Sequence, residues 1–300
     1  MCGIIGIYRR KSSGKRNQKQ QEQLVKKGLA LLKRRGRDCQ QLKTIDGVTF
    51  GHALHAVVQV VPQPLVAGKP KPAMLTANNE IYNWKELSAK FGFTAINDSG
   101  LLLQFLQKEG VTPSALEQLG GVFALGFYRN GEVFIARDIL GEKPVWYSQE
   151  NGFAFASERK VLLAIGYRNV VELNPRTILR YNKKKNRLFE ARRPFFEITP
   201  QLTASREDIR AKINKLFLHA VQKRIPETRF GLLFSGGIDS TIIAQALQKA
   251  GKDFTCYLSI LEHESFHAPG DLTVSIDAAA KLGLKLKIVK ASLKEVEKNL

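Results

Sequence analysis

Residues 231–240 read Gly231-Leu232-Leu233-Phe234-Ser235-Gly236-Gly237-Ile238-Asp239-Ser240, an apolar run followed by a turn rich in Gly and Ser. The run predicts a buried strand, and the spacing of Ile242, Ile243, Ala246 and Leu247 predicts a helix immediately after the turn. Adjacent glycines allow a tight turn and a close approach to a ligand. Because the amino terminus of a helix offers free N–H groups to anions, the stretch predicts a phosphate-binding loop. It lacks the Gly-Lys-Ser/Thr of a P-loop, and a strand-to-helix turn without a ligand is the alternative.

The sequence on either side of this loop alternates between helical and strand patterns. Apolar residues at helical spacing cover 209–220 and 272–282, and continuous apolar runs cover 254–260 and 286–289. Uniformly apolar strands that alternate with helices are typical of a parallel α/β sheet. We therefore expect a partial doubly wound sheet over residues 206–300. The chain ends at Leu300 inside a helical pattern, which favours a fragment of a longer protein.

Residues 1–195 have a different pattern, with many short strands and few helices. Turn formers such as Asn130-Gly131 and Asn151-Gly152 separate the strand-like runs. The expected strands are 3–8, 48–51, 57–61, 122–128, 133–136, 145–147, 153–156 and 178–181, and the expected helices are 19–34 and 101–106. This is an α+β pattern. The segment 193–208, which contains Pro194 and Pro200, is the expected linker between two domains.

The composition limits the classes of partner. Of the 300 residues, 44% are hydrophobic and 25% are charged, which is usual for a globular protein. No apolar run is long enough to span a membrane and no signal peptide is evident, so we expect a cytoplasmic protein without a membrane partner. The net charge of +20 raises nucleic acid as a partner. However, the basic runs carry few aromatic residues, so a basic solvated surface is the better interpretation.

The amino terminus, Met1-Cys2-Gly3-Ile4, contains a candidate nucleophile. Removal of Met1 would expose Cys2 with a free α-amine, whose ordinary pKa is about 7.7–8.0. That amine could act as the general base for the thiol of the same residue. The alternative is a cysteine that follows Met1 without any catalytic role, and only further motifs can decide between the two.

Further motifs follow in order along the chain. Residues 78–83, Asn-Asn-Glu-Ile-Tyr-Asn, resemble the N-G-E-I-Y-N motif of class II glutamine amidotransferases. The other matches are 35–38 with R-G-P-D, Asp98 with S-D-x-E, 136–144 with A-R-D-x-x-G-x-K-P, 155–158 with F-A-S-E, and 235–240 with the S-G-G-I-D-S loop of ATP pyrophosphatases. The whole chain therefore resembles the amino-terminal part of the glutamine-hydrolysing asparagine synthetases.

This resemblance implies a fold and a reaction for the first domain, residues 1–195. The fold would be an α+β amino-terminal-nucleophile sandwich with αββα layers. Cys2 would attack the side-chain amide of glutamine, form a thioester and release ammonia. Asn78 and the backbone N–H of Asn79 would stabilise the oxyanion, and Glu80 and Asp98 would bind the α-amine of glutamine.

For residues 206–300 the resemblance implies the first part of an ATP-binding synthetase domain. ATP would adenylate the side-chain carboxylate of aspartate, and ammonia would displace AMP to give asparagine. Asp239 would help to hold Mg²⁺. The implied ATP-binding residues are Leu233, Ser235, Gly236, Gly237, Asp239, Ser240 and Ser259. Apolar faces beside the linker are compatible with a homodimer.

Two departures from the family pattern keep alternatives open. Asn79 stands where the family has Gly, and Leu54 stands where the family has the Arg of H-x-R-L-x-I, which binds the α-carboxylate of glutamine. One alternative is a related amidotransferase that aminates another carboxylate. The other is a degenerate relative that binds nucleotide but has no glutaminase activity.

Overall fold

The computed structural model describes residues 1–10, 15–57, 59–195, 203–262 and 270–299. The chain folds into two compact units, Met1–Thr199 and Pro200–Leu300. Of the linker predicted over 193–208, residues 196–202 lie outside the described residues.

The first unit contains two six-stranded antiparallel sheets. The strands of one sheet are β1 (Gly3–Arg9), β2 (Cys39–Ile45), β3 (Val48–Leu54), β8 (Trp146–Ser148), β9 (Gly152–Ala156) and β10 (Val171–Glu172). Their order is β10-β8-β9-β1-β3-β2. In this sheet Gly3 pairs with Ala53. Residue 2 therefore lies beside the end of β3.

The second sheet faces the first. Its strands are β4 (Leu65–Ala67), β5 (Ala73–Ile81), β6 (Gly121–Arg129), β7 (Glu132–Arg137), β11 (Thr177–Asn182) and β12 (Arg187–Arg192). Their order is β12-β11-β7-β6-β5-β4, with β5 and β6 in its interior. The long strand β5 carries the polar residues Asn78, Asn79 and Glu80 near its carboxyl end.

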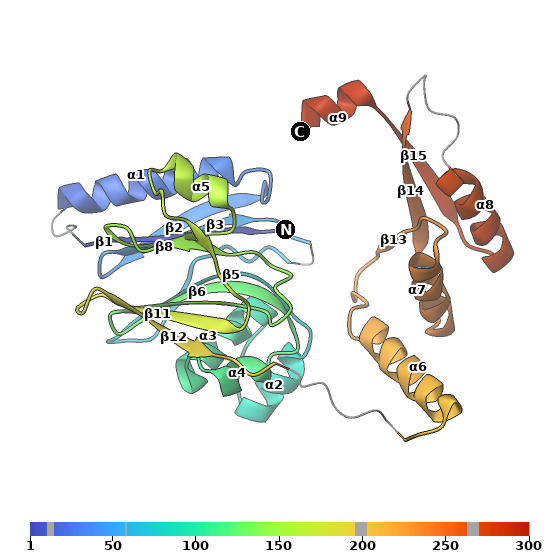
Figure 1. Ribbon diagram of the computed structural model, residues 1–300, viewed down its shortest axis with the longest axis horizontal. Helices are drawn as coiled ribbons and strands as arrows, with labels where there is room; N and C mark the ends of the chain where they lie inside the picture. Colours follow the sequence, from blue (N-terminus) through green and yellow to red (C-terminus); the bar gives the residue numbers. More distant parts are fainter. Residues whose placement is uncertain (11–14, 58, 196–202, 263–269, 300) are drawn as a thin grey trace. The chain divides into compact units, whose positions relative to one another are not determined.

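Helices cover the outer faces of both sheets, so the unit has four layers (Figure 1). The helices are α1 (Lys15–Leu31), α2 (Trp84–Phe91), α3 (Asp98–Glu109), α4 (Pro113–Glu117) and α5 (Arg159–Ala164). One apolar cluster joins α1 and α5 to the first sheet, another fills the space between the sheets, and a third joins α2, α3 and α4 to the second sheet. The predicted αββα sandwich is therefore confirmed.

Two glycines allow the facing sheets to pack closely around one aromatic ring. Gly6 lies on β1 and Gly126 lies on β6, in opposite sheets. A Cβ atom at either position would lie 2.1 Å from the ring of Phe155. The ring is fully buried, and it packs edge-on against Phe50 with the ring centroids 5.3 Å apart. Any side chain at Gly6 or Gly126 would force the sheets or the ring to move.

The second unit is a parallel α/β structure. Its elements are α6 (Arg206–Gln222), β13 (Gly231–Leu233), α7 (Ile238–Lys249), β14 (Thr255–Glu262), α8 (Gly270–Leu282), β15 (Leu286–Ser292) and α9 (Leu293–Asn299). The strands form a parallel sheet in the order β13-β14-β15. The predicted partial parallel sheet is confirmed.

The strand predicted over 57–61 is wrong. The described residues 57 and 59–61 are irregular, and Val57 and Val60 are 75% and 68% exposed. Pro62 follows directly and cannot donate to a strand ladder. Conversely, the sequence patterns missed β2, β4, β5, β10 and β12. Of these, β2 and β12 are edge strands with many polar, solvent-facing residues.

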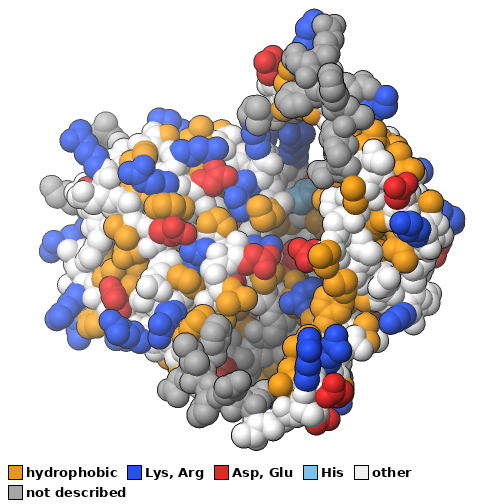
Figure 2. Space-filling view, turned by 45° about the vertical axis from the view of Figure 1, so that its right-hand side comes forward, with side chains coloured by type: hydrophobic (Ala, Val, Ile, Leu, Met, Phe, Trp, Pro, Cys, Tyr) orange, Lys and Arg blue, Asp and Glu red, His pale blue; other side chains and the backbone are white. Residues whose placement is uncertain are grey.

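Two further expectations concern the surface. In the part of the chain that the structure describes, no helix is both long enough and apolar enough to cross a bilayer. On the face seen in Figure 2, Lys and Arg side chains are scattered among acidic and apolar ones and do not form one continuous patch.

Candidate active site

Cys2 lies half-buried at the start of β1, against the residue that follows β3. Its Sγ accepts a hydrogen bond from the His55 N–H at 3.3 Å, and the thiol can donate to the His55 carbonyl oxygen at 3.6 Å. Arg35 Nε donates to the Cys2 carbonyl oxygen at 3.0 Å. These contacts fix both the backbone and the side chain of residue 2.

The segment 35–38 holds Cys2 in place. Arg35 also pairs with Glu158, with Nη1 and Oε1 3.3 Å apart. A Cβ atom at Gly36 would lie 2.2 Å from the Ala53 carbonyl oxygen, so only glycine allows the segment to pass so close to β3. Asp38 Oδ2 accepts the Ala56 N–H at 2.7 Å. The motif at 35–38 therefore contacts both the backbone of Cys2 and the segment 53–56 beside the thiol.

Burial dominates the titration of the thiol and of the terminal amine. Desolvation raises the pKa of the Cys2 thiol, and the His55 hydrogen bond, the terminal amine and Arg35 oppose this effect. Desolvation also lowers the pKa of the Met1 amine. The charge of Asp98 acts on the thiol, and the charges of Glu80 and Lys143 act on the amine. These three side chains therefore lie around the amino terminus.

Asn78 presents a buried amide near the end of β5. The residue is 5% exposed, and its Nδ2 has no hydrogen-bond acceptor among the described residues. Leaving such a donor unpaired costs about 1–3 kcal/mol. A buried donor that no protein group satisfies is suited to an oxygen atom that a ligand supplies, such as an oxyanion.

Buried side chains fix the backbone directly before Asn78. Gln63 Oε1 accepts the Ala77 N–H at 2.8 Å, and Gln63 Nε2 donates to the Ala77 carbonyl oxygen at 3.1 Å. His52 Nε2 also lies 3.2 Å from that carbonyl oxygen. Because Gln63 and His52 are almost fully buried, they hold the strand end that carries Asn78 in one position.

The predicted glutamine-binding residues form two separate contacts. Asp98, in the first turn of α3, accepts hydrogen bonds from the Asn79 side chain at 2.7 Å and from the Ile81 N–H at 3.1 Å. Glu80 is exposed and lies 3.7 Å from Lys143 Nζ. The structure thus brings Cys2, Asn79, Glu80 and Asp98 into one region, although they come from different elements.

Several residues of this region had no role in the sequence-based prediction. Arg35 and Lys143 lie inside matched motifs, so the motifs could have suggested them. Gln63 and Ser99 carry no sequence signal, because only the fold brings them to β5. Leu54, where the family has Arg, is 5% exposed and offers no charge to a carboxylate.

The predicted nucleotide loop connects β13 to α7. Gly236 has φ +73°, and a Cβ atom there would lie 2.7 Å from the backbone N and Cα of Ser275 in α8. Gly237 precedes the helix, and Ser240 Oγ donates to its carbonyl oxygen at 3.1 Å. The hydroxyls of Ser235 and Ser240 lie 3.3 Å apart. The loop has the geometry of an anion-binding turn, with hydroxyls beside the free N–H groups of the helix.

Of the other predicted ATP-binding residues, Leu233 ends β13 and Ser259 lies within β14. Leu233 is 79% exposed and pairs with Tyr257, and Ser259 lies two residues further along β14. Asp239 is exposed in the first turn of α7. Within the described ranges, no three His, Cys, Asp or Glu side chains cluster as a metal site. A single carboxylate still fits Mg²⁺, which is usually bound by one or two carboxylates together with phosphate oxygens.

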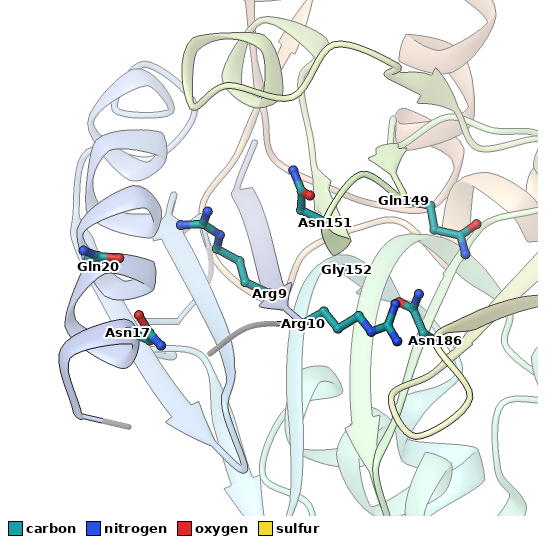
Figure 3. Close-up of a pocket in the computed structure, with 8 residues that line it drawn as sticks. All are labelled: Arg9, Arg10, Asn17, Gln20, Gln149, Asn151, Gly152 and Asn186. Atoms are coloured by element: carbon teal, nitrogen blue, oxygen red, sulfur yellow. The ribbon is translucent and has the colours of Figure 1, made fainter. Parts of the chain in front are cut away.

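A cavity of about 490 Å³ in the first unit lies away from these residues. It opens at the Arg9 end of β1, whereas Cys2 precedes the other end. Figure 3 shows Arg10 and Asn186 pointing toward each other across it. The cavity is lined by Arg9, Arg10, Asn17, Gln20, Gln149, Asn151, Gly152 and Asn186. It therefore takes no part in the chemistry of Cys2.

Comparison with protein families gives two adjacent matches. A family model described as a glutamine amidotransferase domain matches residues 1–214, and one described as asparagine synthase matches residues 212–298. The asparagine synthetase [glutamine-hydrolyzing] of Gallus gallus is 30% identical over 252 residues, covering 73% of this chain and 45% of that protein. Asparagine synthetase B of Escherichia coli K12 is 27% identical over 260 residues, covering 83% and 45%. The chain thus spans 45% of the length of these curated relatives.

Solved structures support the fold. A glutamine phosphoribosylpyrophosphate (PRPP) amidotransferase from B. subtilis, complexed with ADP and GMP, superposes with a TM-score of 0.54 at 15% identity, covering 100% of this chain and 70% of that one. A structure described as the allosteric regulatory enzyme of purine biosynthesis gives 0.55 at 16% identity, covering 99% and 78%. At this identity the likeness concerns the fold alone.

Proposed function

The chain belongs to the family that joins a glutamine amidotransferase domain to an asparagine synthase domain, and from this premise we propose that it supplies glutamine nitrogen to an ATP-activated carboxylate. Residues 1–195 would be the glutaminase domain, and residues 206–300 the first part of the ATP-binding domain. The observation that carries the first half is the buried, unpaired Nδ2 of Asn78 on the strand next to Asp98 and Cys2.

The glutaminase step begins with Cys2 after removal of Met1. The α-amine takes the thiol proton, and the thiolate attacks the side-chain amide carbon of glutamine. The carbonyl oxygen becomes an oxyanion, which accepts hydrogen bonds from Asn78 Nδ2 and the backbone N–H of Asn79. Collapse of the intermediate forms the thioester and expels ammonia, which takes the proton back from the amine. Water then cleaves the thioester to give glutamate and the free thiol.

Two carboxylates would hold the α-ammonium group of glutamine. Asp98 is half-buried and fixed by backbone N–H groups, whereas Glu80 is exposed and balanced by Lys143. Arg35, which donates a hydrogen bond to the Cys2 carbonyl oxygen, would hold Cys2 in position to attack the amide carbon of glutamine. Such positioning lowers the barrier by replacing a bimolecular encounter with a fixed geometry.

The second unit would bind ATP at the loop 235–240, with the adenine flanked by Leu233 and Ser259. The substrate carboxylate would attack the α-phosphorus and expel pyrophosphate, and ammonia would then displace AMP from the acyl group. With aspartate as the acceptor the product is asparagine. Mg²⁺ held by Asp239 would neutralise phosphate charge. A cytoplasmic location is part of this proposal, and the homodimer remains a prediction.

Two alternatives are retained. The acceptor could be another carboxylate, since the family pattern alone carries the choice of aspartate. A degenerate relative without glutaminase activity is favoured by one observation, the buried apolar side chain of Leu54 where the family binds the α-carboxylate. Loss of such a charge-assisted contact would weaken glutamine binding.

The test of the first half is ammonia release from glutamine by the Met1-free protein. We expect Cys2→Ala to abolish it and Asn78→Ala to lower kcat by about 10²–10³-fold, the usual effect of losing one oxyanion donor. Cys39→Ala is the matched control, because Cys39 is also half-buried in the first unit. Equal release by the wild type and Cys2→Ala would contradict the proposal, and no release by either would favour the degenerate relative. Pyrophosphate formation from ATP with candidate acids, compared between wild type and Asp239→Asn, tests the second half.

A further inference from the structure

The side chain of Asn79 contacts the carboxylate of Asp98. Its Nδ2 donates to Asp98 Oδ2 at 2.7 Å, which is a short distance for an amide donor. The same oxygen accepts the Ile81 N–H at 3.1 Å, and Asp98 Oδ1 accepts the Ser99 N–H at 2.8 Å. Three donors therefore orient this carboxylate, and the Asn79 amide is the one side chain among them.

Buried neighbours fix the orientation of the Asn79 amide. Ser99 Oγ donates to Asn79 Oδ1 at 3.2 Å, and Ser99 in turn accepts from Gln63 Nε2 at 3.4 Å. Because a hydroxyl proton faces Oδ1, the NH₂ group of the amide must face Asp98. Gln63 and Ser99 are both buried, at 3% and 6% exposure. The result is one directed chain of donors that runs from Gln63 to Asp98.

This row of hydrogen bonds opposes the cost of burying the charge of Asp98. Desolvation raises the pKa of Asp98, and the hydrogen bonds from Ile81, Ser99 and Asn79 lower it. Glu80 on β5 also raises it. The Cys2 thiol lies within range of the same charge, and Lys143 pairs with Glu80. Without Asn79, one of the groups that keep Asp98 ionised would be lost.

We propose that Asn79 is a positioning residue, which holds the ionised Asp98 carboxylate ready for an α-ammonium group and so makes the first unit select amides of α-amino acids. This inference rests on the proposed glutaminase function. It gives the side chain of Asn79 a role of its own, separate from the backbone N–H that faces the oxyanion.

The first test compares two substrates, glutamine and its analogue with hydrogen in place of the α-amino group. For Asn79→Ala and Asn79→Gly we expect KM for glutamine to rise about tenfold, since a hydrogen bond to a charged group is lost. The KM for the analogue should change less than about twofold, because the analogue has no α-ammonium group for Asp98 to bind. Asn83→Ala is the matched control, because Asn83 also makes two side-chain hydrogen bonds, to Gln118 and Gly120, but does not touch Asp98.

For Asn79→Gly, the direction of the change in KM for glutamine decides the matter. A lower KM for glutamine would mean that the Asn79 amide competes with the substrate ammonium, and it would overturn the proposal. An equal rise for both substrates would also overturn it, since the effect would then be merely structural. The acidic limb of kcat/KM should move to higher pH in the alanine variant, because Asp98 loses a donor that favours its charged form.

A second measurement does not depend on activity. Titration of the Asp98 carboxyl carbon by NMR should give a higher pKa in Asn79→Ala than in the wild type, and a smaller rise in Ser99→Ala, which keeps the Ser99 backbone donor. An unchanged pKa in both variants would overturn the positioning role. If the pKa rises but no variant or wild type releases ammonia, the glutaminase proposal fails while the positioning of Asp98 by Asn79 stands.

Discussion

The two units differ in how their candidate sites are constructed. In the first unit, Cys2 precedes β1, Asn78 lies near the end of β5 and Asp98 begins α3, so three distant parts of the chain must pack correctly to form one site. In the second unit, most predicted ATP-binding residues lie within 233–240, a single strand-to-helix connection. The first site therefore depends on the whole sandwich, whereas the second depends mainly on local backbone geometry.

Burial differs in the same way. Strands β3 and β9 are buried over their whole length, and the network of Gln63, Ser99 and Asn79 lies beneath the first site. In the second unit, α6 has no buried residue, and Leu233 beside the loop is 79% exposed. We expect perturbations of the first unit to act through buried polar groups, and perturbations of the second to act through the loop and its contact with α8.

A substitution at Gly236 should cause the largest loss of stability among these predictions. Such a loss would show that the second site depends on α8 as well as on its own loop. Gly236→Ala must adopt φ +73° and place its Cβ atom 2.7 Å from the backbone of Ser275 in α8. Left-handed strain and a backbone clash together should destabilise the second unit by roughly 4 kcal/mol. Hydrogen exchange, measured by mass spectrometry, should show faster exchange in both α7 and α8.

Gly251 provides the control for this substitution. It also has a positive φ, +65°, but a Cβ atom there would meet nothing within 4 Å. Gly251→Ala should therefore cost only the left-handed strain, about 1 kcal/mol. Equal effects at the two glycines would show that the approach of α8 to the loop does not matter.

A slightly smaller effect on stability is expected from the titration of His52. It would show that buried polar groups control the stability of the first unit. Burial lowers the pKa of His52 from 6.5 to about 4, and its Nδ1 has no partner among the described residues. Below pH 6.5 His52 is protonated in the unfolded chain, but in the folded chain it stays neutral down to about pH 4. The stability of the folded state therefore falls as the pH falls through this range. The loss should reach roughly 3 kcal/mol at pH 4.

His52→Gln should reduce this pH dependence, since glutamine can still donate to the Ala77 carbonyl oxygen without titrating. Both tryptophans of the chain, Trp84 and Trp146, lie in the first unit, so their fluorescence reports its unfolding alone. The exposed His55 of the first unit, replaced by Gln, controls for the loss of one imidazole from that unit. An identical pH dependence in wild type and His52→Gln would contradict the buried neutral imidazole.

The same contrast explains what could be predicted from the sequence. The motif at 235–240 and the helix after it depend on neighbours in the chain, and the parallel sheet was predicted from the apolar runs beside it. Cys2 was a candidate nucleophile from the amino terminus itself, but only the family resemblance decided for its role. Asp98 was predicted through the resemblance alone, and Gln63 and Ser99 were missed because tertiary packing alone brings them to β5. The strand predicted over 57–61 failed because an apolar run before Pro62 resembles a strand locally but lies exposed.

The smallest effect is expected on α6, and it tests whether the second unit has a packed exterior helix comparable with α1 of the first. Leu216 is 59% exposed, whereas Leu29 on α1 is 3% exposed and lies in the cluster that joins α1 to β1. Leu216→Ala should change stability by no more than about 0.5 kcal/mol, as is usual for exposed positions. The matched change Leu29→Ala should cost about 2–5 kcal/mol, because it leaves a cavity under the helix. A denaturant titration followed by tryptophan fluorescence would measure the stability loss of Leu29→Ala. A denaturant titration followed by hydrogen exchange would measure that of Leu216→Ala. A large loss at Leu216 would mean that its side chain is covered in solution, and the second unit would then be as closely packed as the first.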